Sequence, residues 1–231
     1  MKKYSKRTKL LQEKISEESY SFEKGVSLLK EIGTAKFVES VEAHVSLNID
    51  PKYANQQLRT SLVLPNGTGK TLKIAVFTED AFIKEALTAG ATVAGSDDLL
   101  EEMSQGNLDF DILITTPQLM PKLAKLGRVL GPKGLMPSPK SGTVTQDLKG
   151  AINEFKKGKL EYRADKTGIV HLSFGKADFS EDQLRENLLA VYTSIEKNKP
   201  SGVKGRYFKS FSICTTMSPS IALELNTFKV S

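Results

Sequence analysis

The chain has 231 residues, of which 39% are hydrophobic, so it can form one large domain or two of ordinary size around a packed core. This composition excludes a disordered polypeptide, and no apolar run approaches the roughly 20 residues that a bilayer-spanning helix requires. The 33 Lys and Arg exceed the 27 Asp and Glu, which gives a net charge of +6.

Positive charge is concentrated in three stretches that contain no carboxylate: residues 1–12, 112–146 and 197–223. Each stretch has five cations, so together they hold 15 of the 33 Lys and Arg and none of the 27 Asp and Glu. A single charged run is equally consistent with a solvated face. Three such runs in one chain favour a polyanionic partner, with nucleic acid as the first candidate.

The N-terminal residues and the single cysteine bear on the compartment. The first twelve residues lack the apolar centre of a secretory signal, and the acids that follow from Glu13 argue against a transit peptide. Cys214 cannot form an intramolecular disulfide, which agrees with a reducing compartment. Because Cys214 lies in the alternating stretch 211–217, we expect a small buried thiol there and not a nucleophile.

The first third of the chain predicts one helix and two strands. Apolar residues at helical spacing predict an amphipathic helix over residues 22–32, capped by Ser21 and stopped by Gly33. Residues 41–49 and 58–64 alternate with period two, so both are expected to be strands.

The middle of the chain alternates short strands with helices, which is typical of a small parallel α/β unit. Gly and Pro punctuate residues 130–142, and they predict a rigid basic loop that faces an anion. The expected strands are 72–77, 91–94 and 111–115, and the expected helices are 80–89, 97–105, 117–126 and 146–156.

Beyond Gly158 the antiparallel pattern returns. Strands 160–164 and 169–174 flank the turn 165–168, which predicts a hairpin. A helix is expected to begin after Ser180. Two strands, 207–217 and 221–225, are expected to follow it. The expected fold class is α/β, with a discontinuous α+β domain from both termini (residues 1–67 and 159–231) and an inserted α/β domain (residues 68–158).

The sequence contains no arrangement that indicates catalysis. Segment 66–71 is similar to a phosphate-binding loop, but Leu64 stands where the first Gly is required and the loop opens onto a strand. His44 and His171 lie in separate strand patterns 127 positions apart, so we expect packed or hydrogen-bonded histidines and not metal ligands. The chain is therefore predicted not to be an enzyme, and neither a cofactor nor a metal is expected.

The run Lys125–Val144 closely resembles the signature of the L-one family of large-subunit ribosomal proteins, which belong to the mobile stalk beside the ribosomal exit site. The likeness covers nearly the whole chain and fades after Ile221. Further matching segments, in the same order as in the family, are Thr34–His44, Asp50–Lys52, Leu64–Lys70, Asp165–Gly168, Lys204–Gly205 and Thr215–Met217.

This resemblance implies a terminal domain that binds large-subunit (23S-type) rRNA directly, and a Rossmann-like insert that handles departing E-site tRNA. The implied partners are large-subunit rRNA, E-site tRNA and the large ribosomal subunit, with no membrane. The ribosome would be in the bacterial cytoplasm or the plastid stroma. Related proteins also repress their own mRNA, and that role depends here on whether the transcript copies the rRNA site.

The implied RNA contacts lie near the first strand, at the turn 165–168 and at the corner after Thr215. Phe37 can present a flat face to a base or ribose, lysines can meet phosphate, and hydroxyls can bond the 2′-OH. The family usually has Gly where Ser218 stands, so this contact has either shifted or gained a hydroxyl. The full set is Lys36, Phe37, Ser40, Glu42, Lys166, Thr167, Ser210, Thr216, Met217 and Ser218.

Two other functions fit parts of the sequence. The predicted α/β insert is compatible with a nucleotide-binding enzyme, which stabilisation by ATP or NAD, but not by an rRNA fragment, would reveal. A general single-strand binder would need aromatic side chains along a groove. The chain has no Trp, and its basic runs contain few aromatics.

Overall fold

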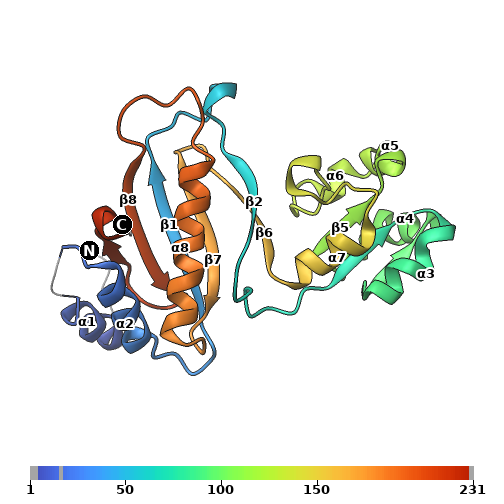
Figure 1. Ribbon diagram of the computed structural model, residues 1–231. Coiled ribbons are helices and arrows are strands. Elements are labelled where there is room, and N and C mark those ends of the chain that lie inside the picture. The colour runs from blue at the N-terminus through green and yellow to red at the C-terminus, as the bar shows by residue number, and fades with distance from the viewer. Residues whose placement is uncertain (1–4, 16–17, 229–231) are drawn as a thin grey trace. The chain divides into compact units, whose positions relative to one another are not determined.

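The computed structural model describes residues 5–15 and 18–228, and these residues adopt a mixed α/β fold with three sheets (Figure 1). They divide into two compact units. One unit runs to Gly69 and resumes at Tyr162, and the other extends from Lys70 to Glu161. Every described helix is too short or too polar to cross a bilayer.

The first unit is built on a four-stranded antiparallel sheet in the order β7-β1-β8-β9. Helix α8 crosses this sheet and packs beside α2 (Figure 1). The elements of this unit are α1 (Lys6–Glu13), α2 (Phe22–Ile32), β1 (Ser40–Leu47), a 3-10 turn (Ala54–Gln56), β2 (Arg59–Val63), β6 (Lys159–Arg163), β7 (Ile169–Lys176), α8 (Glu181–Lys197), β8 (Phe208–Thr215), β9 (Ile221–Leu223) and a 3-10 turn (Leu225–Phe228). The boundary between the units falls within β6, which belongs to this unit from Tyr162 onward.

Strand β1 shows how the sequence divides the two faces of the sheet. Its apolar residues, Val41, Ala43, Val45 and Leu47, are all buried, and the polar residues between them are half-buried. Helices α2 and α8 bury their apolar faces on the same side, as their helical spacing predicts. The other face of the sheet therefore carries the polar residues and stays partly open to solvent.

Both helices of this layer begin where the sequence predicts. Ser180 and Gln183 form a capping box at the start of α8, which satisfies backbone N–H groups that the first helical turn leaves unpaired. Helix α2 follows Ser21 and ends before Gly33. Ser21 makes no side-chain capping hydrogen bond, so of the two predicted caps only Ser180 satisfies a backbone N–H of its helix.

The predicted hairpin around residues 165–168 is correct at the turn and wrong beyond it. The Gly168 N–H donates to the Asp165 carbonyl at 3.1 Å, and a bridge joins Ala164 to Val170. Strand β6 then pairs with β2, whereas β7 pairs with β1. Alternation shows which residues share a face of a strand, but it does not show which strand lies beside it.

The second unit has a three-stranded parallel sheet in the order β4-β3-β5, with helices on both faces. Helices α3 and α7 pack on one face, and α4, α5 and α6 pack on the other. The elements are β3 (Ile74–Phe77), α3 (Asp80–Ala89), β4 (Val93–Gly95), α4 (Asp97–Ser104), β5 (Ile112–Thr115), a 3-10 turn (Pro117–Leu119), α5 (Met120–Ala124), α6 (Gly127–Leu130), a 3-10 turn (Pro139–Ser141) and α7 (Leu148–Lys156).

Two predictions for this unit need correction. The helix expected at 117–126 is split into a 3-10 turn and α5, because Pro121 has no N–H to continue a regular helical ladder. The basic loop expected at residues 130–142 begins at the last residue of α6 and includes a 3-10 turn near its other end. It is also internally bonded: the Ser138 N–H donates to Thr143 Oγ1 at 2.8 Å, and the Ser141 hydroxyl donates to the Ser138 carbonyl at 2.9 Å.

Candidate nucleic-acid interface

The open face of the four-stranded sheet is lined with polar side chains that form rows across β7, β1 and β8. Serine hydroxyls predominate, and one carboxylate, two imidazoles and one thiol lie among them. In the order β7, β1, β8, the rows are Lys176, Ser40 and Thr216; Ser173, Glu42 and Cys214; His171, His44 and Ser212; and Ile169, Ser46 and Ser210.

The predicted contact residues lie on this face and at its two ends. Ser40 and Glu42 are on β1, and Ser210 is on β8, all three on the open side. The Ser40 hydroxyl accepts a hydrogen bond from Lys176 Nζ at 2.9 Å. Lys176 thus adds a cation that the sequence analysis missed, because only the strand register places it beside Ser40.

One end of the face presents large apolar side chains to solvent. Phe37 and Met217 are each 55% exposed, so Phe37 is not part of the core, and Lys36 next to it is also exposed. Thr216 lies against Ser40, whose N–H donates to the Thr216 hydroxyl at 3.0 Å. The loop before β1 and the turn after β8 therefore meet at this end.

A buried carboxylate, Glu39, holds this loop to this turn. Its Oε2 accepts from the Thr215 hydroxyl at 2.7 Å and the Met217 N–H at 2.8 Å, and its Oε1 accepts from the Ala35 N–H at 2.9 Å. Burial by itself would raise the pKa of Glu39, but these hydrogen bonds and the nearby Arg7 outweigh it and lower the pKa. Sequence reasoning missed Glu39 because two of its partners lie at the other end of the chain.

The hydroxyl of Ser218 is turned into the corner. It accepts from the Thr215 N–H at 2.9 Å and lies 3.1 Å from the Pro219 carbonyl. No non-glycine residue that the structure describes has a positive φ, so Ser218 adopts an ordinary backbone conformation. The Ser218 side chain therefore bonds to the backbone of its own turn, at the position where the resemblance implies a glycine.

The other end of the face is the turn between β6 and β7. The Asp165 carboxylate accepts from the N–H groups of Thr167 and Ile169 at 2.9 and 2.8 Å, and from the Thr167 hydroxyl at 2.7 Å. The hydrogen bond from Ile169, followed by that from Thr167, lowers the pKa of Asp165. This bonding fixes the turn and leaves Lys166 exposed at its tip.

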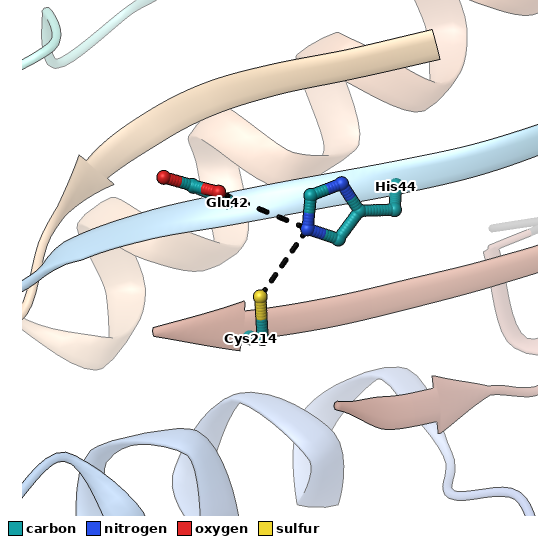
Figure 2. Close-up of side chains that lie close together, drawn as sticks. All are labelled: Glu42, His44 and Cys214. Atoms are coloured by element: carbon teal, nitrogen blue, oxygen red, sulfur yellow. Dashed lines mark hydrogen bonds and ion pairs between the residues drawn. The ribbon is translucent and has the colours of Figure 1, made fainter. Parts of the chain in front are cut away.

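The centre of the face brings together residues that are far apart in the sequence (Figure 2). His44 Nδ1 lies 2.8 Å from His171 Nδ1, and His44 Nε2 lies 3.3 Å from Cys214 Sγ and 3.8 Å from a Glu42 carboxylate oxygen. The prediction of hydrogen-bonded histidines is correct, but their contact was not foreseen. Cys214 is half-buried on this face, not fully buried as expected.

Burial and charge set the protonation of this central group. Burial, followed by the neighbouring His171, lowers the pKa of His44, so its imidazole is neutral at pH 7 and its approach to Glu42 is not an ion pair there. Burial, with Glu42 and Glu39 nearby, raises the pKa of the Cys214 thiol. Among the described residues, Glu42, His44 and Cys214 form the one group of this kind that could hold a metal ion.

The basic runs are largely exposed where the structure describes them. In the run 112–146, Lys122 pairs with Asp97 at 2.7 Å, and the remaining cations are exposed with no ion pair to another described residue. The cations of the run 197–223 are likewise exposed. Lys2 and Lys3 of the N-terminal run lie outside the described residues.

The carboxyl ends of β3 and β4 border a pocket of 180 Å³ in the second unit. Nucleotides bind at this edge in many doubly wound folds. Here the lining includes Glu79, Asp80 and Asp97, and the cation at the pocket, Lys122, is already paired with Asp97. This surplus of carboxylates repels phosphate, which argues against the nucleotide-binding alternative.

Comparison with known proteins identifies the family. A profile of the ribosomal protein L1p/L10e family matches residues 28–219. The large ribosomal subunit protein uL1c of Trieres chinensis is 62% identical over 229 residues, covering 99% of this chain and 100% of the relative. That of Rhodomonas salina is also 62% identical, covering 99% and 98%. The large ribosomal subunit protein uL1 of Prochlorococcus marinus (strain NATL1A) is 57% identical, covering 98% and 96%. The chain therefore belongs to the ribosomal protein L1p/L10e family, in its plastid and cyanobacterial type.

Proposed function

We propose that this protein is a structural constituent of the large ribosomal subunit and binds large-subunit rRNA directly through the open sheet face of its first unit. The observation that carries the proposal is the gathering of all ten predicted contact residues onto that face and its two ends. They come from four separate parts of the sequence. Membership of a ribosomal-protein family also agrees with the prediction that the chain is not an enzyme.

The side chains on this face suit structured RNA. Phe37 and Met217 offer exposed apolar surface on which a base or ribose can stack. Hydroxyls such as those of Ser210 and Thr216 can bond 2′-OH groups, which distinguish RNA from DNA. Glu42 can only accept hydrogen bonds when ionised, so its RNA partner is a 2′-OH or a base amino group and not a phosphate.

The lysines of this surface lie at its margins. Lys36 is near the end with Phe37, Lys166 is at the opposite turn, and Lys176 and Lys209 are at strand ends. Strand β1 separates the two ends by about 24 Å, because its eight residues are joined by seven steps of roughly 3.4 Å each. A folded RNA that contacts both ends must therefore present phosphates at a matching separation.

The finer organisation belongs to the same proposal. Residues 1–67 and 159–231 form a discontinuous RNA-binding α+β domain, and residues 68–158 form an inserted Rossmann-like domain. The insert, with the exposed cations of the run 112–146, takes part in releasing E-site tRNA at the mobile stalk. The protein works on the ribosome, in a bacterial cytoplasm or a plastid stroma. It represses its own mRNA if the transcript copies the rRNA site.

Binding of the full chain to a stalk fragment of large-subunit rRNA tests the proposal. We expect Phe37→Ala to weaken binding by roughly 5-fold to 150-fold, the range of one lost stacking contact, and Met217→Ala to weaken it through the loss of apolar contact. Both side chains are mostly exposed, so neither variant should change the unfolding midpoint appreciably. Phe82→Ala is the matched control, since Phe82 is 45% exposed and lies in the second unit.

Salt provides a second measurement. The logarithm of the affinity should fall linearly with the logarithm of the salt concentration, because phosphate neutralisation releases counterions. Lys166→Ala should reduce that slope by about 0.7 to 0.9, and Phe37→Ala should leave it unchanged. Unaltered binding in both Phe37→Ala and Met217→Ala would refute this surface as the rRNA site.

A further inference from the structure

The group at the centre of the open face has the composition of a metal site. Glu42 and His44 project from β1, and Cys214 projects toward them from β8 (Figure 2). Their ligand atoms all lie within 4.8 Å of one another. A carboxylate oxygen, an imidazole nitrogen and a thiolate sulfur are the three ligand types that proteins use for Zn²⁺.

We propose that Glu42, His44 and Cys214 form a binding site for a thiophilic divalent cation, with Zn²⁺ the best match. The site has three protein ligands, so water or a fourth ligand completes the tetrahedron. Mg²⁺ and Ca²⁺ do not fit, because they prefer oxygen ligands in larger number. The site shares Glu42 with the proposed RNA contacts, whereas His44 and Cys214 are not among them, and cation binding is testable without RNA.

The distances agree with tetrahedral coordination after small side-chain movements. Bond lengths of about 2.3 Å for Zn–S and about 2.0 Å for Zn–N place the two ligand atoms roughly 3.5 Å apart. His44 Nε2 and Cys214 Sγ are 3.3 Å apart. The Glu42 oxygen at 3.8 Å from Nε2 needs to move about 0.4 Å closer. Glu42 is 39% exposed, so its side chain has room for that movement.

The second ring nitrogen of His44 supports ligation by the first. Metal-bound histidines usually donate the other ring N–H to a fixed acceptor, which sets the tautomer. His44 Nδ1 lies 2.8 Å from His171 Nδ1, and His171 Nε2 lies 3.7 Å from an Asp165 carboxylate oxygen. If His171 carries its proton on Nε2, facing Asp165, its Nδ1 accepts from His44. The lone pair of His44 Nε2 then points toward Cys214.

In that tautomer the thiol proton occupies the place of the cation. The Cys214 S–H donates to His44 Nε2 across the 3.3 Å gap. When a divalent cation binds, it takes the sulfur and nitrogen lone pairs, and the thiol proton leaves to solvent. The charge of the three side chains and the cation together is then 0, compared with −1 before binding. Cation binding thus removes the uncompensated negative charge from the middle of this face.

The sequence makes the test unusually clean, because it has one Cys and two His. Co²⁺ is titrated into the full-length protein, reduced with a non-thiol reductant, and the thiolate-to-metal absorption band is recorded. Any such band must come from Cys214. We expect a band at one equivalent of Co²⁺, its loss on adding Zn²⁺, and no effect of excess Mg²⁺.

Variants separate the ligands from their support. Cys214→Ser should abolish the band, and His44→Gln and Glu42→Gln should each weaken Co²⁺ binding at least 10-fold. His171→Gln should weaken it by roughly 10-fold to 100-fold, as removal of an orienting partner does, while the band remains. Ser46→Ala is the control, since it lies on the same face of β1 two residues from His44. Far-UV circular dichroism checks the fold of each variant.

Several outcomes would overturn the assignment. One is the absence of a thiolate band with the wild-type protein. Another is a band of equal affinity in His44→Gln and Glu42→Gln, which would mean that the lone thiol binds Co²⁺ without a built site. A band that appears only with dimerisation, detected by size-exclusion chromatography, would also overturn it. None of these results bears on rRNA binding, so the two proposals fail independently.

Discussion

Replacing Glu39 with Gln tests what holds together the end of the open face that carries Phe37 and Met217. The carboxylate receives three hydrogen bonds, two at Oε2 and one at Oε1. An amide has one oxygen and one NH₂ group. If its oxygen takes the place of Oε2, its NH₂ group faces the Ala35 N–H, and two donors meet in a buried site.

The cost follows from these contacts. One buried donor without a partner costs about 1–3 kcal/mol, and two charge-assisted hydrogen bonds become weaker neutral ones. Relief from burying a charge offsets part of the loss, since burial is the largest single influence on this group. We expect the Glu39→Gln variant to be about 2 kcal/mol less stable. We also expect it to bind stalk rRNA more weakly, because the loop no longer holds its position.

Urea unfolding and hydrogen exchange measure the two effects. Exchange should accelerate at residues 35–41 and 215–218 and stay unchanged in α8. Glu31→Gln, at an exposed position at the end of α2, makes the same chemical change as a control and should stay within about 0.5 kcal/mol of the wild type. Wild-type stability and unchanged exchange in Glu39→Gln would refute the role of this carboxylate.

The stability difference between the wild type and Glu39→Gln should depend on pH in one direction. The pKa of Glu39 is lower in the folded protein than in the unfolded chain, so the unfolded state binds the proton more readily. The stabilising contribution is complete above its ordinary pKa of 4.5 and is lost as the pH falls through the folded value. The stability difference between wild type and Glu39→Gln should therefore shrink under acid conditions. A difference that grows as the pH falls would contradict the assignment.

Three further variants test other parts of the molecule. Asn187→Ala should lower the free energy of unfolding in urea by about 3 kcal/mol, because the N–H of residue 66 and the carbonyls of residues 67 and 174 lose their partner. An unchanged free energy would contradict the role of these three hydrogen bonds. Ser218→Gly should lower the unfolding free energy by about 1 kcal/mol, since the turn loses its side-chain acceptor, and should leave rRNA affinity equal or higher. The double variant Lys133→Ala and Lys140→Ala should weaken rRNA binding less than Phe37→Ala, and a larger loss would assign the main site to the second unit.

The elements that sequence predicts best are those with local signals at both ends. Helix α3 spans residues 80–89 and α2 spans 22–32, as predicted, because apolar spacing and the glycine that follows each helix are properties of neighbouring positions. The helix predicted at 117–126 is not continuous, and the reason is local and present in the sequence. Pro121 has no N–H to donate, so the regular backbone ladder is interrupted there.

The candidate site is less accessible from sequence, because it depends on which strands are neighbours. His44 and His171 are 127 positions apart and meet since β1 and β7 pair in one particular register. Cys214 joins them from β8 for the same reason. The alternation of each strand predicts that these residues face one side, but register is a long-range property. The contact residues were implied by the family resemblance. The hydrogen bonds of Glu39 and Lys176 that hold some of them in place are apparent only in the fold.

Charge on the first unit is arranged in a way that bears on the proposed binding of rRNA. A face covered with lysines would hold any polyanion, since phosphate contacts carry no sequence information. Here the centre of the face is composed of hydroxyls, imidazoles and a carboxylate, and the cations lie at its ends and in exposed runs. When no cation is bound, Glu42 at the centre repels phosphate, so we expect the backbone of a bound RNA to pass along the margins while sugars or bases face the sheet. If the proposed site is correct, we expect it to favour an RNA whose shape separates its phosphates from its exposed nucleotides, and so to select structured RNA over a random single strand.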